Sequence, residues 1–199
     1  MKQIISRAAG MLVLMTILCG FIYTLAVTGI GQLVFHNQAN GSVITVDGKT
    51  YGSSLLAQPF SGDQYLWGRP MNLDTSSFTD EDGNPTLYAW ASNKSPASDE
   101  YADIVAQRVD ALHEADPTQA DVAIPVDLVT CSGSGLDPEI SPAAATYQLH
   151  RIAEARQLSE EEVQAIIDKH TTGRFLGVFG EPRVNVLEVN LELDGILEG

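Results

Sequence analysis

The hydrophobic positions of this chain are concentrated near its N-terminus, where no Asp, Glu, Lys or Arg occurs between Arg7 and Asp47. Residues 11–30 read MLVLMTILCGFIYTLAVTGI, and ten of these 20 residues are Leu, Ile, Val or Phe. A helix of about 20 apolar residues crosses the ~30 Å hydrocarbon core of a bilayer. The pattern therefore predicts one membrane-spanning helix, with residues 1–35 as an N-terminal transmembrane anchor and residues 36–199 as one soluble domain.

Two alternatives to an uncleaved span are weaker. A cleaved signal peptide has a shorter apolar region of about 7–15 residues and a small-residue exit site, and this run is longer and lacks such a site. Lipidation at Cys19 is the other alternative, but the bulky Leu18 precedes it where a small residue is needed. Lys2 and Arg7 precede the span, and positive residues stay on the cytoplasmic side. We therefore expect a single-pass cell (inner or plasma) membrane protein whose N-terminus is cytoplasmic and whose C-terminal domain is extracytoplasmic.

The span carries a second pattern, because Thr16, Gly20, Thr24 and Thr28 recur every four residues. Residues at positions i and i+4 share one helix face. Small and hydroxyl residues on one face allow helices to pack closely in lipid. The alternative is that each Thr hydroxyl bonds a carbonyl of its own helix. If the face is used for packing, it implies at least one partner helix.

Beyond the span, helical and strand periodicities follow one another, which predicts a mixed α+β domain with a small sheet and about three helices. The helices are predicted over residues 99–115, 141–157 and 159–173. Ser98 is a capping residue for the first helix, and Ser159 with Glu162 forms a capping box at the start of the third.

Strands are predicted on both sides of these helices. Asp47-Gly48 between two short apolar runs indicates a type I′ hairpin. A short buried strand is expected over residues 123–129. Leu187, Val189, Leu191 and Leu193 alternate with polar residues, which predicts a half-buried strand over residues 183–194. Residues 61–97 are rich in Gly, Pro, Asn and Ser, so we expect irregular structure whose scattered aromatic residues pack in the core.

Charge narrows the possible partners. All 26 acidic residues lie at or beyond Asp47, against nine Lys and Arg in the same region, a formal charge of −17. This negative charge argues against nucleic acid as a partner, because a protein that binds nucleic acid needs a basic surface. The acidic surface either attracts cations or serves solubility alone. Cys19 and Cys131 offer no intrachain disulfide, and the Cys and His spacing shows no zinc pattern.

The densest candidate for chemistry is the segment 125–145, which reads as a strand, a glycine turn and a helix start. The N–H groups of Ser132-Gly133-Ser134-Gly135 and the helix dipole suit a phosphate. The turn is neither a Walker A loop nor a nucleophile elbow. Asp137 and other nearby acids would repel a phosphate, and a structural turn is the alternative interpretation. Because no base accompanies these serines or Cys131, we predict no catalytic residue. The Cys and His spacing likewise predicts no metal site.

Three segments carry a resemblance to a known family. They are VDLVTCSGSGLDPEISPAAA at residues 126–145, GEPRVNVLEVNLELD at residues 180–194, and Gly68-Arg69-Pro70. Together they resemble the C subunit of the bacterial Kdp-type high-affinity potassium-transporting ATPase, and the resemblance extends over the whole chain. The chain departs from the family pattern at Glu139, where the family often has His, at Cys131, where it often has Ala, and over residues 91–99, where ASNKSPASD replaces the usual segment.

The resemblance implies a non-catalytic accessory subunit of an ATP-driven potassium uptake pump. Its partners would be a channel-like potassium-binding subunit, a P-type ATPase subunit and a small membrane subunit. Potassium would be the transported ion and ATP the fuel, and the subunit would assemble the complex and act as a catalytic chaperone that raises ATP affinity. Candidate contacts with a partner or nucleotide are Ser132, Gly133, Ser134, Gly135, Asp137 and Gln148. Because nucleotide is cytoplasmic and the domain is expected outside, we favour an allosteric effect on ATP affinity. The alternative function is a membrane-anchored extracytoplasmic enzyme or binding protein using the Ser132–Gly135 turn.

Overall fold

The computed structural model describes residues 1–197 and separates into two compact units. The N-terminal unit is Met1–Val43, and the C-terminal unit begins at Ile44. The fold class is the mixed α+β arrangement that the sequence predicts, with an apolar N-terminal helix followed by a domain of helices and small sheets.

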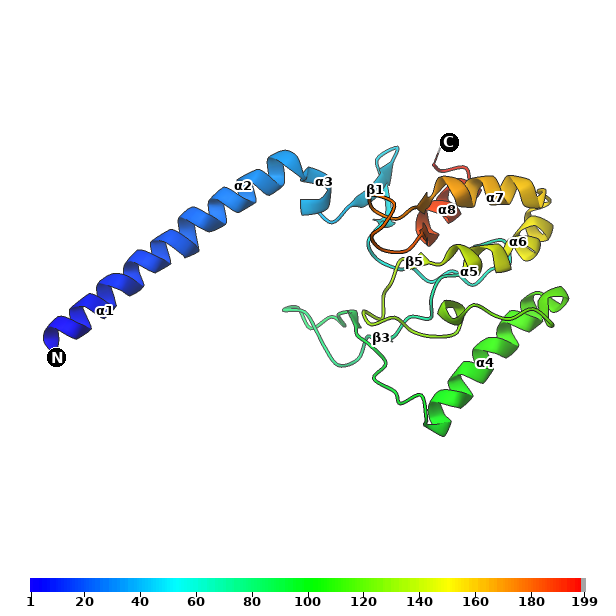
Figure 1. The fold of residues 1–199 in the computed structure, drawn as a ribbon, viewed down its shortest axis with the longest axis horizontal. Helices are drawn as coiled ribbons and strands as arrows, with labels where there is room; N and C mark the ends of the chain where they lie inside the picture. The colour runs from blue at the N-terminus through cyan, green and yellow to red at the C-terminus, as the bar shows by residue number, and fades with distance from the viewer. Residues whose placement is uncertain (198–199) are drawn as a thin grey trace. The chain divides into compact units, whose positions relative to one another are not determined.

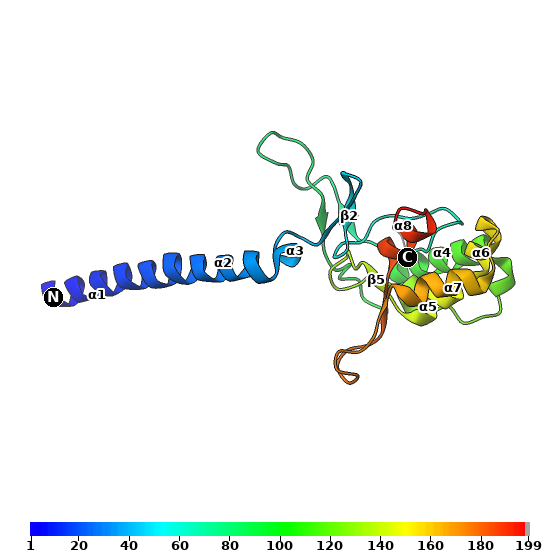
Figure 2. The same ribbon diagram turned by 90° about the horizontal axis from the view of Figure 1, so that it is seen from above.

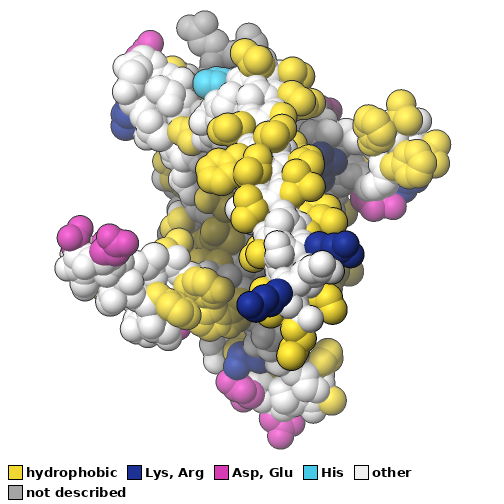
Figure 3. Space-filling view, turned by 90° about the vertical axis from the view of Figure 1, so that its left-hand side faces the viewer, with side chains coloured by type: hydrophobic (Ala, Val, Ile, Leu, Met, Phe, Trp, Pro, Cys, Tyr) yellow, Lys and Arg dark blue, Asp and Glu magenta, His cyan; other side chains and the backbone are white. Residues whose placement is uncertain are grey.

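One long helix forms most of the N-terminal unit (Figure 1). α1 (Lys2–Met15) continues through a π-helical segment, Thr16–Tyr23, into α2 (Thr24–Val34), and the short α3 (His36–Ala39) follows. Within residues 1–197, the 33-residue stretch Lys2–Val34 is the helix that is long and apolar enough to cross a membrane. Its large apolar side chains are exposed, and Figure 3 shows such side chains covering the helix surface. The structure therefore contains the predicted apolar helix and leaves its surface free for lipid or a partner helix.

Two threonines of the four-residue repeat bond within their own helix. Thr16 Oγ1 donates to the Leu12 carbonyl at 2.8 Å, and Thr24 Oγ1 donates to the Cys19 carbonyl at 3.1 Å. Gly20 lies between them with only Thr16 Cγ2 near its Cβ direction, at 3.9 Å. The hydroxyls are thus satisfied locally, while the small face at Gly20 remains open.

The C-terminal unit is built on a three-stranded antiparallel sheet with the order β5-β7-β6. The strands are β5 (Glu139–Ile140), β6 (Thr171–Thr172) and β7 (Arg183–Asn185). The helices are α4 (Asp99–Ala115), α5 (Pro142–Tyr147), α6 (Leu149–Arg156), α7 (Glu160–Lys169) and α8 (Val186–Leu193). The core has its most buried members in Leu66, Ile152, Val163, Val184 and Val189. Figure 2 shows α5, α6, α7 and α8 grouped together in this unit.

Local sequence signals at turns and helix starts predicted several elements correctly. β1 (Val43–Val46) and β2 (Lys49–Ser53) pair around Asp47 and Gly48, both at positive φ, as the hairpin signal requires. α4 has the predicted bounds, and Ser98 accepts a hydrogen bond from the Tyr101 N–H. The predicted capping box at Ser159 and Glu162 is present at the start of α7.

The predicted strand over residues 183–194 is wrong beyond Asn185. The Asn185 side chain accepts from the Glu188 N–H at 3.1 Å, and this cap starts α8. Asn190 is 1 % exposed, although an alternating strand would place it outside. Its side chain donates to the Leu66 carbonyl at 2.9 Å and accepts from the Leu66 N–H at 2.8 Å. The alternating leucines and valines are buried as predicted, but on the wide inner face of a helix.

Three other boundaries also differ. The expected strand over residues 123–129 is a 3₁₀ turn, Val126–Leu128, because Pro125 begins it and its carbonyl accepts from the Leu128 N–H at 3.0 Å. The expected helix over 141–157 is two helices, α5 and α6, interrupted at Gln148. The third helix ends at Lys169 instead of residue 173, because Thr171 pairs with Val184 in the sheet.

Residues 61–97 are largely irregular, as predicted, and hold only the short strands β3 (Leu73–Asp74) and β4 (Tyr88–Ala89). The expected core position of their aromatics is wrong for Phe78, Tyr88 and Trp90. Phe78 and Tyr88 lie 4.7 Å apart by ring centroids, and Tyr88 lies 5.2 Å from Trp90, yet all three are exposed. This segment projects from the unit in Figure 2.

Candidate functional site

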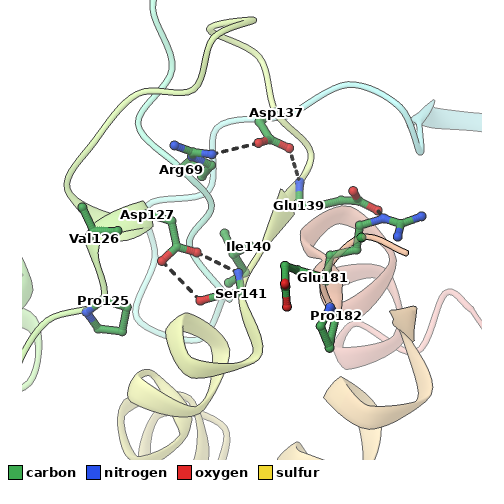
Figure 4. Close-up of a pocket in the computed structure, with 12 residues that line it drawn as sticks. Arg69, Pro125, Val126, Asp127, Asp137, Glu139, Ile140, Ser141, Glu181 and Pro182 are labelled. Carbon is green, nitrogen blue, oxygen red and sulfur yellow. Dashed lines mark hydrogen bonds and ion pairs between the residues drawn. The ribbon is translucent and has the colours of Figure 1, made fainter. Parts of the chain in front are cut away.

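The three segments that carry the family resemblance meet at one open cleft of about 690 Å³ in the C-terminal unit (Figure 4). One segment contributes Arg69, another runs from Pro125 to Ser141, and the third is the entry to β7 at residues 180–183. These segments are far apart in the chain; the pairing of β5 with β7 brings two of them together, and the Arg69–Asp137 ion pair brings in the third. This convergence makes the cleft the candidate functional site.

Asp127 forms one wall of the cleft and fixes the start of α5. Its carboxylate accepts from the Ser141 N–H at 2.7 Å and from the Ser141 hydroxyl at 3.2 Å. Ser141 Oγ in turn accepts from the Ala144 N–H at 3.1 Å as the helix cap. Figure 4 shows the Asp127 side chain turned towards Ser141. Both oxygens of Asp127 therefore have protein donors.

Arg69 lies on a loop far away in the chain, and its side chain holds the segment before β5 in place. Its Nη1 contacts Asp137 Oδ2 at 3.1 Å, and its Nη2 donates to the Cys131 carbonyl at 3.3 Å. Asp137 also accepts from the Glu139 N–H at 3.1 Å. Arg69 Nε is buried without a hydrogen-bond partner. A charge-assisted contact of this kind orients the loop more firmly than a neutral one.

The third side of the cleft is held by a cross-strand ion pair. Arg183 Nε lies 2.8 Å from Glu139 Oε1, and these residues are on the neighbouring strands β7 and β5. Glu181 pairs with Arg174 at 2.6 Å. Acidic side chains outnumber basic ones among the residues that line the cleft. The geometry therefore suits contact with a polar or cationic protein surface, and the Ser141 hydroxyl, which donates to Asp127, serves as the cap of α5.

The Ser132–Gly135 turn, predicted as a phosphate or partner contact, lies outside the lining of this cleft. The Gly135 N–H donates to Ser132 Oγ at 3.1 Å, and its carbonyl accepts from the Asn72 N–H at 3.0 Å. Gly135 has φ +70°, and a Cβ there would lie 2.3 Å from the Trp90 carbonyl oxygen. The turn therefore packs through Gly135 against the irregular segment that contains β3 and β4, whereas nothing lies within 4 Å of a Cβ at Gly133.

Of the other predicted contacts, the structure places Asp137 in the cleft and Gln148 in the core. Gln148 is 2 % exposed, and its Oε1 accepts from the Trp67 N–H at 2.9 Å and from Arg151 at 2.7 Å. Its Nε2 donates to the carbonyls of Trp67 and Ala144. Burial lowers the pKa of Arg151 to about 10, so this side chain stays charged at neutral pH. Gln148 thus joins the break between α5 and α6 to the loop at Trp67.

Arg69, Glu139 and Arg183 are site residues that sequence reasoning did not select. The motif Gly68-Arg69-Pro70 was a signal for the first of them, because it is part of the family resemblance. Nothing in the sequence indicated that Glu139 and Arg183 face each other, since their pairing depends on the sheet register. Within residues 1–197, no group of three His, Cys, Asp or Glu side chains could hold a metal ion.

An ion-pair cluster lies at the base of the segment that leads into β6. His170 Nε2 contacts Glu192 Oε2 at 2.5 Å, and Lys169 Nζ contacts the same carboxylate at 2.9 Å. Burial raises the pKa of Glu192, but the hydrogen bonds from Lys169 and His170 outweigh burial and bring that pKa below its usual value. The cluster joins the end of α7 to α8.

Comparison with known proteins identifies the family. The family model described as K+-transporting ATPase, c chain, KdpC, matches residues 5–195. The chain belongs to the KdpC family. A relative from Clostridium botulinum, strain Alaska E43, is 55 % identical over 197 residues, which cover 99 % of this chain and 98 % of the relative. A relative from Clostridium perfringens is 54 % identical over 195 residues, and one from Herminiimonas arsenicoxydans is 48 % identical over 194 residues, each covering 98 % of both chains.

All three relatives bear the name potassium-transporting ATPase KdpC subunit. The KdpC match includes the apolar helix, the cleft and α8, so it covers both units of the chain. A KdpC chain is a subunit of a potassium-transporting ATPase and is not its catalytic subunit.

Proposed function

We propose that the chain is the accessory subunit of an ATP-driven high-affinity potassium uptake pump, in which it assembles or stabilises the complex. The observation that carries this proposal is the family match over residues 5–195, which includes the apolar helix as well as the cleft. The other subunits would be a channel-like potassium-binding subunit, a P-type ATPase subunit and a small membrane subunit. Potassium is then the cargo of the whole complex, and ATP is its fuel.

Residues 1–35 would anchor the chain in the membrane, and residues 36–199 would lie on the extracytoplasmic side. Lys2 and Arg7 flank the apolar helix at its N-terminal end, which favours a cytoplasmic N-terminus. The exposed face at Gly20 offers a place where a partner helix packs closely. An impermeant protease added to intact cells should then degrade the C-terminal unit, and complete protection would contradict this orientation.

The chain is also proposed to raise the affinity of the P-type ATPase subunit for ATP. This proposed effect is best explained as allosteric. An outer domain changes the affinity of a distant nucleotide site if it binds one conformation of the pump more tightly than another. The Gly135 N–H already has Ser132 Oγ as its acceptor, and the turn packs on the segment at Asn72 and Trp90. These contacts favour a structural turn over direct contact with nucleotide.

The experiment that tests this proposal is purification of the tagged full-length chain from its native membrane in mild detergent. We expect larger membrane subunits to co-purify, together with potassium-stimulated ATPase activity. The chain expressed alone should show no ATP turnover. Recovery of the wild-type chain without partners, or ATP turnover by the isolated chain, would contradict the proposal.

A further inference from the structure

The hairpin between β6 and β7, residues 173–182, projects from the helices of the C-terminal unit as the orange loop of Figure 2. Its stem continues the sheet through the pairs Thr171–Val184 and Thr172–Arg183. Further out, the Phe175 N–H donates to the Phe179 carbonyl at 2.8 Å, and the Phe179 N–H donates to the Phe175 carbonyl at 3.0 Å. The hairpin is therefore a preformed element whose backbone is already ordered.

The tip of this hairpin carries large apolar side chains that nothing in the described chain covers. Phe175 is 71 % exposed, Leu176 76 %, Val178 70 % and Phe179 63 %. By contrast, the aliphatic side chains of the helices and of β7 form the buried core, among them Ile152, Val163, Val184 and Val189. Contiguous exposed apolar side chains of this kind mark an interaction surface in a soluble domain.

The backbone at the tip gives a second reason to assign it an interaction role. Leu176 has φ +53°, and the next residue, Gly177, has φ +75°. Positive φ favours Gly, Asn or Asp and is strained for a side chain such as Leu. A turn that only reverses the chain in water would favour Asn at position 176. The structure keeps a strained leucine at the most exposed point of the hairpin.

The charges around the tip favour a protein partner over a lipid surface. Arg174 is the basic residue next to the tip, and Glu181 already pairs with it at 2.6 Å. The region from Asp47 onward carries a formal charge of −17. Loops and helices that bind anionic bilayers combine an apolar face with several Lys and Arg, whereas this hairpin carries Arg174 alone, which is already paired with Glu181. The base of the hairpin at residues 180–183 also lines the cleft, so the same hairpin carries the apolar tip and one side of the cleft.

We propose that the hairpin tip is the anchor by which the C-terminal unit docks into an apolar pocket on another protein subunit of the pump. The identity of the partner rests on the proposed function, whereas the docking surface rests on the hairpin itself. Phe175, Leu176 and Phe179 enter the pocket, and the charged cleft beside them meets the polar rim around it. Aromatic and aliphatic anchors surrounded by a polar rim are the usual anatomy of a protein interface.

The test uses the full-length chain in its native complex and two matched double variants. F175S/F179S removes both aromatic anchors, and F78S/L87S removes two exposed apolar side chains from the other projecting segment. We expect F175S/F179S to weaken retention of the partner subunits at least about tenfold. F78S/L87S should leave retention near the wild-type level. Equal losses in both variants, or no loss in F175S/F179S, would overturn the proposal.

A photoreactive amino acid at position 176 identifies the partner directly and does not require the variants to weaken binding. A cross-link to a larger membrane subunit supports the proposal. A cross-link to lipid only, or no cross-link while position 87 gives one, overturns it. If the wild-type chain co-purifies with the pump in these cases, the proposed function survives and the docking surface is wrong. If the wild-type chain does not co-purify, the proposed function itself fails.

Discussion

Two glycine turns of the C-terminal unit, Ser132–Gly135 and Leu176–Gly177, have opposite surroundings. The Ser132–Gly135 turn is made of small polar residues and packs against Asn72 and Trp90. Their backbone atoms leave no room for a Cβ at Gly135. The Leu176–Gly177 turn carries apolar side chains and stands in solvent. The comparison teaches that a small, polar, glycine-rich turn is not by itself a binding loop. The environment of each turn decides whether its residues serve packing or recognition.

The largest effect is expected at the packed turn. Gly135→Val should lower the free energy of unfolding by about 3 kcal/mol or more, because it adds a strained φ and a clash with the Trp90 carbonyl. Chemical denaturation of the full chain in detergent measures this change.

Gly133→Ala is the matched control, because nothing lies within 4 Å of the added Cβ. We expect a change within about 0.5 kcal/mol for it. If both variants were equally mild, the turn would not be a packing element, and its role as a ligand loop would be open again.

The next largest loss of stability is expected at Gln148. This residue was also predicted as a contact, but it lies in the core. Gln148→Leu should cost about 2–3 kcal/mol, since the buried Trp67 backbone groups and Arg151 lose their partner. Gln164→Leu on the exposed face of α7 is the control and should change stability little. Thermal unfolding of both variants tests this. A Gln148→Leu variant as stable as the control would show that the network is dispensable.

The exposed turn should respond in the opposite direction. Leu176→Asn should raise the free energy of unfolding by about 0.5–1 kcal/mol, because Asn tolerates positive φ better than Leu. The same variant should weaken assembly with the partner subunits, since it removes an apolar anchor. Unfolding of the chain and co-purification of the complex are measured in parallel. A variant that is destabilised and assembles normally would reverse the contrast between the two turns.

The smallest effect concerns the ion-pair cluster of Lys169, His170 and Glu192. The pKa of Glu192 is lowered in the folded chain, so its ionised form contributes stability that is present above its usual value near 4.5. That contribution is lost as pH falls through the lower, folded pKa, when Glu192 becomes protonated. Glu192→Gln should remove this part of the acid dependence, by about a few tenths of a kcal/mol. Denaturation midpoints between neutral pH and about pH 3 measure it, with Glu161→Gln as an exposed control. Identical pH profiles for wild type and Glu192→Gln would contradict it.

The elements that the sequence predicted correctly depend on residues close together in the chain. The Asp47-Gly48 hairpin, the Ser98 cap and the Ser159–Glu162 capping box each act within a few residues, and all are present. The strand predicted over residues 183–194 failed because alternation alone does not weigh the Asn185 cap or the burial of Asn190. Patterns with local causes therefore survived, while a pattern that depended on tertiary surroundings did not.

The cleft could be predicted only in part. The sequence selected Asp137 and the Ser132–Gly135 turn as candidate contacts, of which Asp137 lines the cleft and the turn does not. Arg69 reaches Asp137 from a loop 68 positions away in the chain, and Arg183 reaches Glu139 across 44 positions. The Arg183–Glu139 contact follows from the pairing of β5 with β7 and the Arg69–Asp137 contact from the path of a distant loop, neither of which periodicity reveals. The exposed hairpin tip was missed because its apolar run is short and resembles an ordinary buried segment.

The most direct test of the central claim compares the purified pump with and without this chain and measures the dependence of potassium-stimulated ATPase activity on ATP concentration. The account predicts that adding back the full-length chain restores a stable complex and lowers the KM for ATP several-fold. The F175S/F179S variant should restore neither at the same concentration. If the complex without the chain had the same stability and the same KM as the complete pump, the chain would not be the accessory subunit proposed.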